Sequence, residues 1–186
     1  MDLADHLRIQ AYANPLANRR LQSAIARLPD TEFSAPRTSF FPSIAQTLNH
    51  LLAVDLYYIG ALYGDAGLEA AYRAYVPALT VAELKPRQAQ SDARLIAWCD
   101  ILDAPGCARS IAMDRGTHVQ RDAAAHVLAH LFMHQTHHRG QVHAMLAGTA
   151  VKPPQLDEFL MPSDARFRVD DMAALGWDEA AMFRSG

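Results

Sequence analysis

Apolar residues recur every three or four positions along most of this chain, a spacing typical of amphipathic helices. The first such repeat, within residues 2–28, consists of Leu3, Leu7, Leu21, Ile25 and Leu28. Pro15 interrupts this repeat. Because proline lacks a backbone N–H and clashes with the preceding turn, we expect a kink or a break near Asn14.

A second repeat predicts a helix between Pro42 and Gly64. Its apolar positions are Ile44, Leu48, Leu51, Leu52, Leu56, Ile59 and Leu62. Proline is favoured in the first helical turn, so the helix is expected to begin at Pro42, and Gly64–Asp65 is expected to end it. The flanking segments show no helical period, so 29–41 is expected to be a loop and 65–79 a connector.

A third helix is predicted over roughly residues 80–103. Thr80 and Glu83 have the spacing of a capping box, in which each side chain accepts a hydrogen bond from the other's backbone N–H. Pro86 argues against an unbroken start, so a beginning at Pro86 is the alternative. The inward positions are Leu84, Leu95, Trp98 and Ile101. Farther on, ARSIAMD (108–114) is expected to form a short strand or nothing regular.

A fourth helix is expected from about residue 120 to 147, ended by Gly148. Residues 151–186 contain several prolines and a mixed composition, which indicates a tail along the surface with a short helix near 169–183. Four long helices with little strand signal predict an all-α fold. We expect an antiparallel four-helix bundle over residues 1–150, with an irregular C-terminal tail packed on it.

Composition and charge narrow the class of protein. Of the 186 residues, 51% are hydrophobic and 20% are charged, an ordinary globular balance. The net charge of −3 and the lack of a Lys/Arg cluster argue against nucleic-acid binding. Apolar runs fall far short of the roughly 18 residues of a membrane span, and the N-terminus has no signal-peptide core. Cys99 and Cys107 suggest no disulfide framework, so we expect a cytoplasmic protein.

Histidines concentrate in residues 126–143, which hold six of the nine in the chain. The six are His126, His130, His134, His137, His138 and His143. Four of them are four residues apart, so on a helix they would follow one face. At about 100° per residue, His130 and His138 lie about 40° to either side of His134. Because neutral imidazole is a common metal ligand, the pattern predicts a metal-binding stripe.

The tightest chelating pair in this stripe is His134 with His138, and His130 is an alternative or a neighbour. Zinc prefers four ligands, so a third protein ligand has to come from another helix. The best candidate is His50, which lies among leucines near the centre of the second predicted helix. The weaker alternatives, near predicted helix ends, are His6 and His118. A single histidine on an apolar face is usually a hydrogen-bonded core residue. The metal hypothesis therefore depends on the number of histidines that this one segment contains.

The spacing excludes several familiar active sites. Gln135 stands where an HExxH zinc protease has its glutamate, and the stripe lacks the carboxylates of a Glu-x-x-His di-iron site. No GxSxG motif or Gly-rich phosphate loop occurs. No general base is evident, because Asp55 lies about 140° from His50 around its helix. Gln141 is expected to contact a ligand, a substrate or a metal-binding histidine, and Arg139 a neighbouring helix or a dimer partner.

Four segments, in order along the chain, resemble the motifs of a known family. They are ANRRL (17–21), SIAQTLNHLLAVD (43–55), HLFMHQTHHRGQV (130–142) and PPQLDEFL (153–160). Together they resemble the first helix, the second helix, the last helix and the following segment of the DinB/YfiT-like family. The resemblance covers nearly the whole chain, and the occurrence of the four segments in this order makes it specific.

The resemblance implies a four-helix bundle, often a homodimer, in which three histidines hold a divalent metal ion. Matched residue by residue, the three are His50, His134 and His138. His130 matches a position outside the three. Imidazole suits several metals, and zinc or nickel is expected first, with iron as an alternative.

Three neutral protein ligands would leave the metal an open position, as in catalytic rather than structural sites. The leading hypothesis is therefore a metal-dependent enzyme of the thiol-dependent S-transferase type, using a low-molecular-weight thiol as the resemblance implies for some relatives. The alternatives are a hydrolase using metal-bound hydroxide and a non-catalytic, stress-related protein that binds metal and a ligand. The expected partners are a small-molecule substrate or thiol and a second copy of the chain, with no nucleic acid and no membrane.

Overall fold

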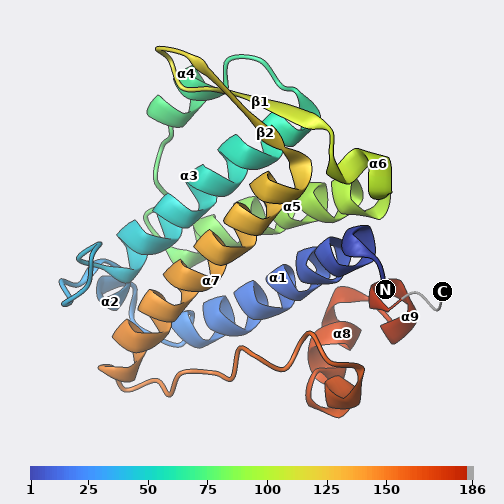
Figure 1. Ribbon diagram of the computed structural model, residues 1–186. Coiled ribbons are helices and arrows are strands. Elements are labelled where there is room, and N and C mark those ends of the chain that lie inside the picture. Colours follow the sequence, from blue (N-terminus) through green and yellow to red (C-terminus); the bar gives the residue numbers. More distant parts are fainter. Residues whose placement is uncertain (184–186) are drawn as a thin grey trace.

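The computed structural model describes residues 1–183, and it is mostly helical with one small two-stranded sheet. Its long helices are α1 (Leu3–Ile25), α3 (Ile44–Tyr63), α5 (Val81–Asp100) and α7 (Ala124–Ala147). α1 packs against α5 and α7, and α3 packs against the same two helices (Figure 1). The predominantly helical fold predicted from the periodicity is confirmed. Within the described part of the chain, no helix is both long enough and apolar enough to cross a membrane.

α1 passes through Pro15 unbroken, so the break considered at this position is wrong. The carboxylate of Asp2 caps the helix by accepting a hydrogen bond from the Asp5 N–H at 2.9 Å. Pro15 is itself buried, between the fully buried side chains of Ala11 and Leu16. Apolar packing along this face outweighs the one hydrogen bond that proline cannot make.

α3 begins after Ser43, not at Pro42 as the sequence suggested. Ser43 has an extended backbone, and its hydroxyl accepts a hydrogen bond from the Gln46 N–H at 3.1 Å. A serine cap satisfies a free N–H of the first turn, which proline at this position does not. The predicted end is confirmed, because Gly64 adopts the left-handed φ of 76° that closes many helices.

α5 begins at the capping residues that the sequence indicated. The Thr80 hydroxyl accepts a hydrogen bond from the Glu83 N–H at 3.2 Å. The Glu83 carboxylate accepts one in return from the Leu79 N–H at 2.8 Å, one residue before the cap. Because this pair fixes the first turn, the helix already runs from Val81 and includes Pro86, and the alternative start at Pro86 is wrong.

Three short helices occupy segments that were expected to be irregular. They are α2 (Asp30–Ser34), α4 (Leu68–Arg73) and α6 (Ala104–Cys107). The expectation of a plain loop over 29–41 and a plain connector over 65–79 is therefore wrong in part. None of the three exceeds six residues, which is too short for a helical period to show in the sequence.

A β-hairpin precedes the histidine helix. β1 (Ser110–Asp114) pairs antiparallel with β2 (Val119–Ala123), with Ile111 opposite Asp122. β1 is the short strand considered for this region. β2 takes up the residues expected to start the fourth helix at 120, so α7 begins only at Ala124. The predicted end at Gly148 is confirmed.

A buried polar layer separates two apolar clusters along the four long helices. One cluster surrounds Trp98 near the hairpin, and the other surrounds Leu48 near α2. Between them, every long helix contributes polar side chains that are at most 9% exposed. These are Asn14, Asn18, Asp55, Gln88, Asp92, Gln135 and Arg139. The layer thus crosses the interior at the level of the histidine stripe.

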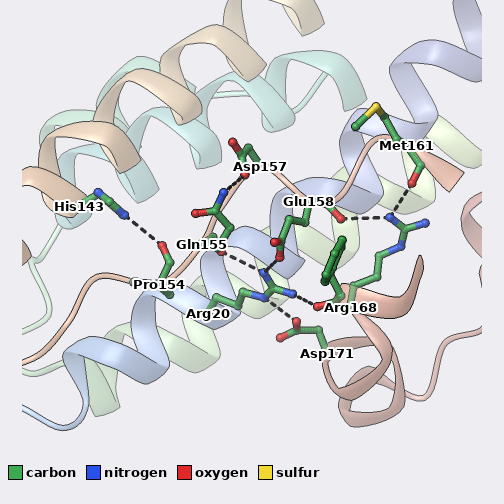
Figure 2. A network of polar contacts seen from close by, with 10 residues as sticks. Arg20, His143, Pro154, Gln155, Asp157, Glu158, Met161, Arg168 and Asp171 are labelled. Atoms are coloured by element: carbon green, nitrogen blue, oxygen red, sulfur yellow. Dashed lines mark hydrogen bonds and ion pairs between the residues drawn. The ribbon is translucent and has the colours of Figure 1, made fainter. Parts of the chain in front are cut away.

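Residues after α7 run along the outside of α1 and include η1 (Pro162–Phe167), α8 (Val169–Leu175) and α9 (Glu179–Met182). The short helix expected near 169–183 is thus two helices. Arg20 of α1 holds this segment (Figure 2): its Nε donates to Asp171 at 2.6 Å and its Nη1 to Glu158 at 2.8 Å. Arg168, which is fully buried, donates to Glu179 and to backbone carbonyls of the tail.

Replacing Arg20 by alanine is expected to loosen the C-terminal segment. The change removes charge-assisted hydrogen bonds to both carboxylates and leaves Asp171, among the described residues, with only its longer contact to Arg19. We expect a loss of about 2 kcal/mol in the free energy of unfolding and faster proteolysis within residues 151–175. Arg19→Ala is the matched control, because Arg19 is 40% exposed and its contact with Asp171, at 4.0 Å, is long. Equal protease resistance of the two variants would contradict this role of Arg20.

Candidate metal centre

Three histidines from two helices meet at one point. His134 and His138 lie on successive turns of α7, and His50 faces them from the adjacent helix α3. The Nε2 atoms of His50 and His134 are 3.1 Å apart. Each histidine offers one nitrogen within 4.8 Å of the others, so the cluster could hold a metal ion. His138 is buried, and the other two are partly exposed.

Gln141 fixes the protonation pattern of His138. The Nδ1 of His138 lies 2.8 Å from the Gln141 side-chain oxygen. An amide oxygen only accepts hydrogen bonds, so Nδ1 carries the proton and donates. In the neutral ring, Nε2 then keeps its lone pair for the cluster, which is the role that partners of metal-bound histidines commonly have. Contact of Gln141 with a clustered histidine was one of the roles considered from the sequence.

The surroundings keep all three imidazoles neutral. Burial, with smaller contributions from the neighbouring histidines, lowers the pKa of His134 to about 3. Burial also lowers the pKa of His50, with a smaller effect of the same sign from His138. The pKa of His138 is lowered by burial, against a smaller opposing effect of the Gln141 hydrogen bond, and His137 lowers it further. At neutral pH the three rings therefore offer lone pairs rather than N–H⁺ groups. Neutral imidazoles bind metal ions through these lone pairs, and no protonated ring would repel a cation placed among them.

The spacing and chemistry of the cluster fit a divalent cation. Two nitrogens bound at about 2.1 Å to one tetrahedral ion lie roughly 3.4 Å apart, close to the observed His50–His134 separation. Within residues 1–183, no carboxylate or thiol belongs to the cluster. The Nδ1 of His134 is buried and has no hydrogen-bond partner among the described residues. An all-imidazole set suits zinc, nickel, copper or iron.

Phe41, which the sequence did not single out, covers one side of the cluster. Its ring centroid lies 4.5 Å from that of His50 and 5.7 Å from that of His138. It precedes α3 in the chain, directly before the Pro42–Ser43 cap. An apolar ring at this distance limits the access of water to the two imidazoles.

A cavity opens beside His134. It has a volume of about 310 Å³ and lies between α3, α4, the hairpin and α7. Its walls are Val54, Tyr57, Tyr58, Glu69, Tyr72, Asp114, Arg115, His130 and His134. Tyr57 and Tyr58 of α3 both contribute to this wall.

A second cavity opens beside His50 and is more apolar. Its volume is about 430 Å³, and its walls include Phe41, Ala53, Tyr75 and Leu79 as well as His50. Tyr72 lines both cavities. The histidine cluster is therefore reached from two spaces of different character.

The remaining histidines of the stripe lie outside the cluster. His130 is exposed in the wall of the first cavity, with its ring centroid 6.2 Å from that of His134. His137 is exposed and contacts the Gln141 amide. His126 is exposed, and His143 contacts the carbonyl of Pro154 in the C-terminal segment. The other two candidates, His6 and His118, are both exposed and are not part of the cluster.

Asp55 faces the polar layer rather than the metal cluster. Its carboxylate accepts hydrogen bonds from Gln88 at 2.9 Å and from Gln135 at 3.0 Å. Complete burial raises the pKa of Asp55 to about 7, with a smaller contribution from Asp92. Because Gln135 directly follows His134 on α7, this contact ties the histidine helix to α3. Arg139 likewise packs inward, donating to Asn18 at 3.1 Å and to Asn14.

Comparison with protein-family models matches residues 10–169 to the model described as the DinB family. The chain belongs to the DinB family. The match includes all three clustered histidines, and it continues past α7 into the C-terminal segment that Arg20 holds. None of the curated proteins searched matches this DinB sequence.

Several residues around the site gave no usable signal in the sequence. Arg115 and Asp114 reach the first cavity only because the hairpin folds back over α3. Glu69 and Tyr72 come from α4, which is too short to show a period. For Phe41, the pair of phenylalanines directly before the cap of α3 was a signal that could have been used.

Proposed function

We propose that His50, His134 and His138 bind one divalent cation, and that this DinB protein is a metal-dependent enzyme of the thiol-dependent S-transferase type. The observation that carries the proposal is a cluster of three neutral imidazoles on two helices, open to two cavities of different polarity. Two spaces that meet at one cluster suit a reaction between two substrates. The expected metal is zinc or nickel, with iron as the alternative.

The chemistry of the site follows from its ligands. A divalent ion among three neutral imidazoles would keep its full charge and supply Lewis acidity, which favours the thiolate form of a bound thiol. Gln141 keeps the His138 lone pair directed to the cluster, and Phe41 limits water beside His50. The cavity beside His134 would hold the polar thiol, and the more apolar cavity beside His50 would hold the electrophile.

The proposal also includes the finer features that the family suggests. The four long helices would form an antiparallel bundle over residues 1–150, with residues 151–186 as a tail packed on it. We propose a homodimer in the cytoplasm, acting on a small molecule rather than on nucleic acid. Light scattering of the purified protein measures its molar mass in solution and so tests the homodimer.

Turnover of monochlorobimane with small thiols tests the proposed reaction. The thiol releases its proton to solvent, its sulfur bonds to carbon, and chloride leaves with the electrons of the C–Cl bond. We expect turnover with the metal-loaded protein, and none above the uncatalysed rate with the metal-free protein or with His134→Ala. No metal-dependent turnover with any thiol would contradict the transferase proposal.

A hydrolase and a non-catalytic binding protein are the competing functions. Hydrolysis of an ester in the absence of thiol, dependent on the same metal, would favour the hydrolase. Binding of metal and ligand without turnover in either assay would favour the binding protein.

A further inference from the structure

The cavity beside His134 has aromatic walls and one guanidinium group that forms no ion pair in the described residues. Tyr57, Tyr58 and Tyr72 supply the aromatic surface, and the ring centroids of Tyr57 and Tyr72 are 6.0 Å apart. Arg115, in the turn between β1 and β2, supplies the guanidinium. A cavity of about 310 Å³ that reaches from Arg115 to His134 has room for one small molecule.

Arg115 is held in place by neutral groups alone. Its guanidinium carbon lies 5.2 Å from the ring centroid of Tyr57 and 5.4 Å from that of Tyr58. Its Nη2 donates to the Tyr58 hydroxyl and its Nε to the Gln120 side-chain oxygen, both at 3.1 Å. In residues 1–183, Arg115 forms no ion pair with a carboxylate. Its orientation is thus fixed by these neutral partners.

The two carboxylates in the same wall are engaged elsewhere. Glu69 forms an ion pair with Arg73, one turn along α4. Asp114 accepts a hydrogen bond from the Gly116 N–H at 2.8 Å within the hairpin turn. Neither carboxylate forms an ion pair with Arg115 in the described residues. A half-buried guanidinium on an aromatic surface is a strong partner for a planar anion.

We propose that this cavity binds a thiol that carries a carboxylate, with the carboxylate paired to Arg115 and the sulfur directed to the histidine cluster. The inference rests on the proposed S-transferase function and names the class of thiol. A carboxylate fits better than a phosphate, because a single guanidinium matches one negative charge. Two acidic side chains in the same wall would also disfavour a doubly charged group.

Binding of matched thiols tests the assignment. 3-Mercaptopropionate and its neutral amide differ only in charge, and each is titrated calorimetrically into the zinc-loaded protein. We expect the carboxylate to bind about tenfold more tightly than the amide, the effect of one charge-assisted contact. Arg115→Gln should abolish this preference, and Arg115→Lys should retain part of it. Arg121→Gln is the matched control on the exposed side of β2, and it should keep the full preference.

Equal affinity of the two thiols for the wild-type protein would overturn the inference while leaving the S-transferase proposal intact. So would an undiminished preference in Arg115→Gln.

A second readout separates the two claims without metal. Propionate and propionamide are titrated into the metal-free, ¹⁵N-labelled protein, and the Arg115 Nε–H resonance is followed. We expect a saturable shift with propionate alone. If that shift occurs but no thiol binds in a metal-dependent way, the S-transferase proposal fails and the carboxylate subsite stands. If propionate produces no shift, the subsite itself is contradicted, even if the Arg115→Gln variant does not fold.

Discussion

His134→Ala is expected to lower the affinity for a divalent metal more than about 100-fold, because only two ligands on separate helices would remain. His134 contacts both other members of the cluster: its ring centroid lies 4.3 Å from that of His138 and 5.1 Å from that of His50. His50→Ala should have an effect of similar size, since it removes the only ligand on α3. Competition with a fluorescent zinc chelator measures both affinities.

The fold should survive these substitutions, so that loss of metal is not loss of structure. His50 and His134 are partly exposed, and the contact between their Nε2 atoms is only partly buried. Circular dichroism and thermal unfolding of the metal-free variants should match those of the metal-free wild type. His126→Ala, an exposed position on the same helix, is the control and should bind metal normally. Full metal affinity in both ligand variants would show that the assignment is wrong.

Arg139→Ala is expected to destabilise the protein by about 3–5 kcal/mol, the typical cost of removing one partner from a buried charged network. Arg139 donates to the side chains of Asn14 and Asn18 in the polar layer. Its positive charge stabilises the carboxylates of Asp55 and Asp92, while burial lowers the pKa of Arg139 itself to about 10. Without it, two buried acidic groups would remain with no cation.

Chemical denaturation measures this loss, and a compensated variant tests its cause. Arg27→Ala is the control, because Arg27 is exposed just beyond the end of α1, and it should change stability by less than about 0.5 kcal/mol. Combining Arg139→Met with Asp55→Asn and Asp92→Asn should recover part of the lost stability, since no buried charge is then left alone. A loss below about 1 kcal/mol for Arg139→Ala would contradict the role of this network.

The long helices could be predicted from the sequence because their signals are local. A period of three to four apolar residues marks each of them, and the ends at Gly64 and Gly148 follow from a residue type that closes helices. Errors arose where tertiary contacts decide the local structure. Packing carries α1 through Pro15, and pairing with β1 draws residues 119–123 out of the histidine helix.

The residues of the candidate site likewise fall into those that local spacing predicts and those that tertiary contacts bring together. The pairing of His134 with His138 is a consequence of helix geometry and can be obtained from four-residue spacing. His50 is 84 positions away from His134, so no spacing links it to the pair. The sequence suggested it only as the best third ligand, from its place among leucines of another helix, and the resemblance to a family pointed to the same residue. Arg115 could not be foreseen, because the hairpin brings it to the site without any periodic signal. Phe41 was missed, although the two phenylalanines before the cap of α3 were a usable signal.

The position of Asp55 around α3 predicts which way its side chain faces but not what it contacts. Its position around α3 correctly indicated that it does not join the histidines. The same argument could not reveal its partners, because Gln88 and Gln135 come from two other helices. Which helices adjoin α3 is decided by the packing of the whole chain.

The metal content of protein purified without an affinity tag tests the central claim most directly. Elemental analysis should find one divalent ion per chain, zinc, nickel or iron, in the wild type and little in His134→Ala. The metal-free wild type should take up one equivalent when zinc or nickel is added. If the purified protein contains no stoichiometric metal, and the metal-free protein takes up none, the three histidines are not a metal site.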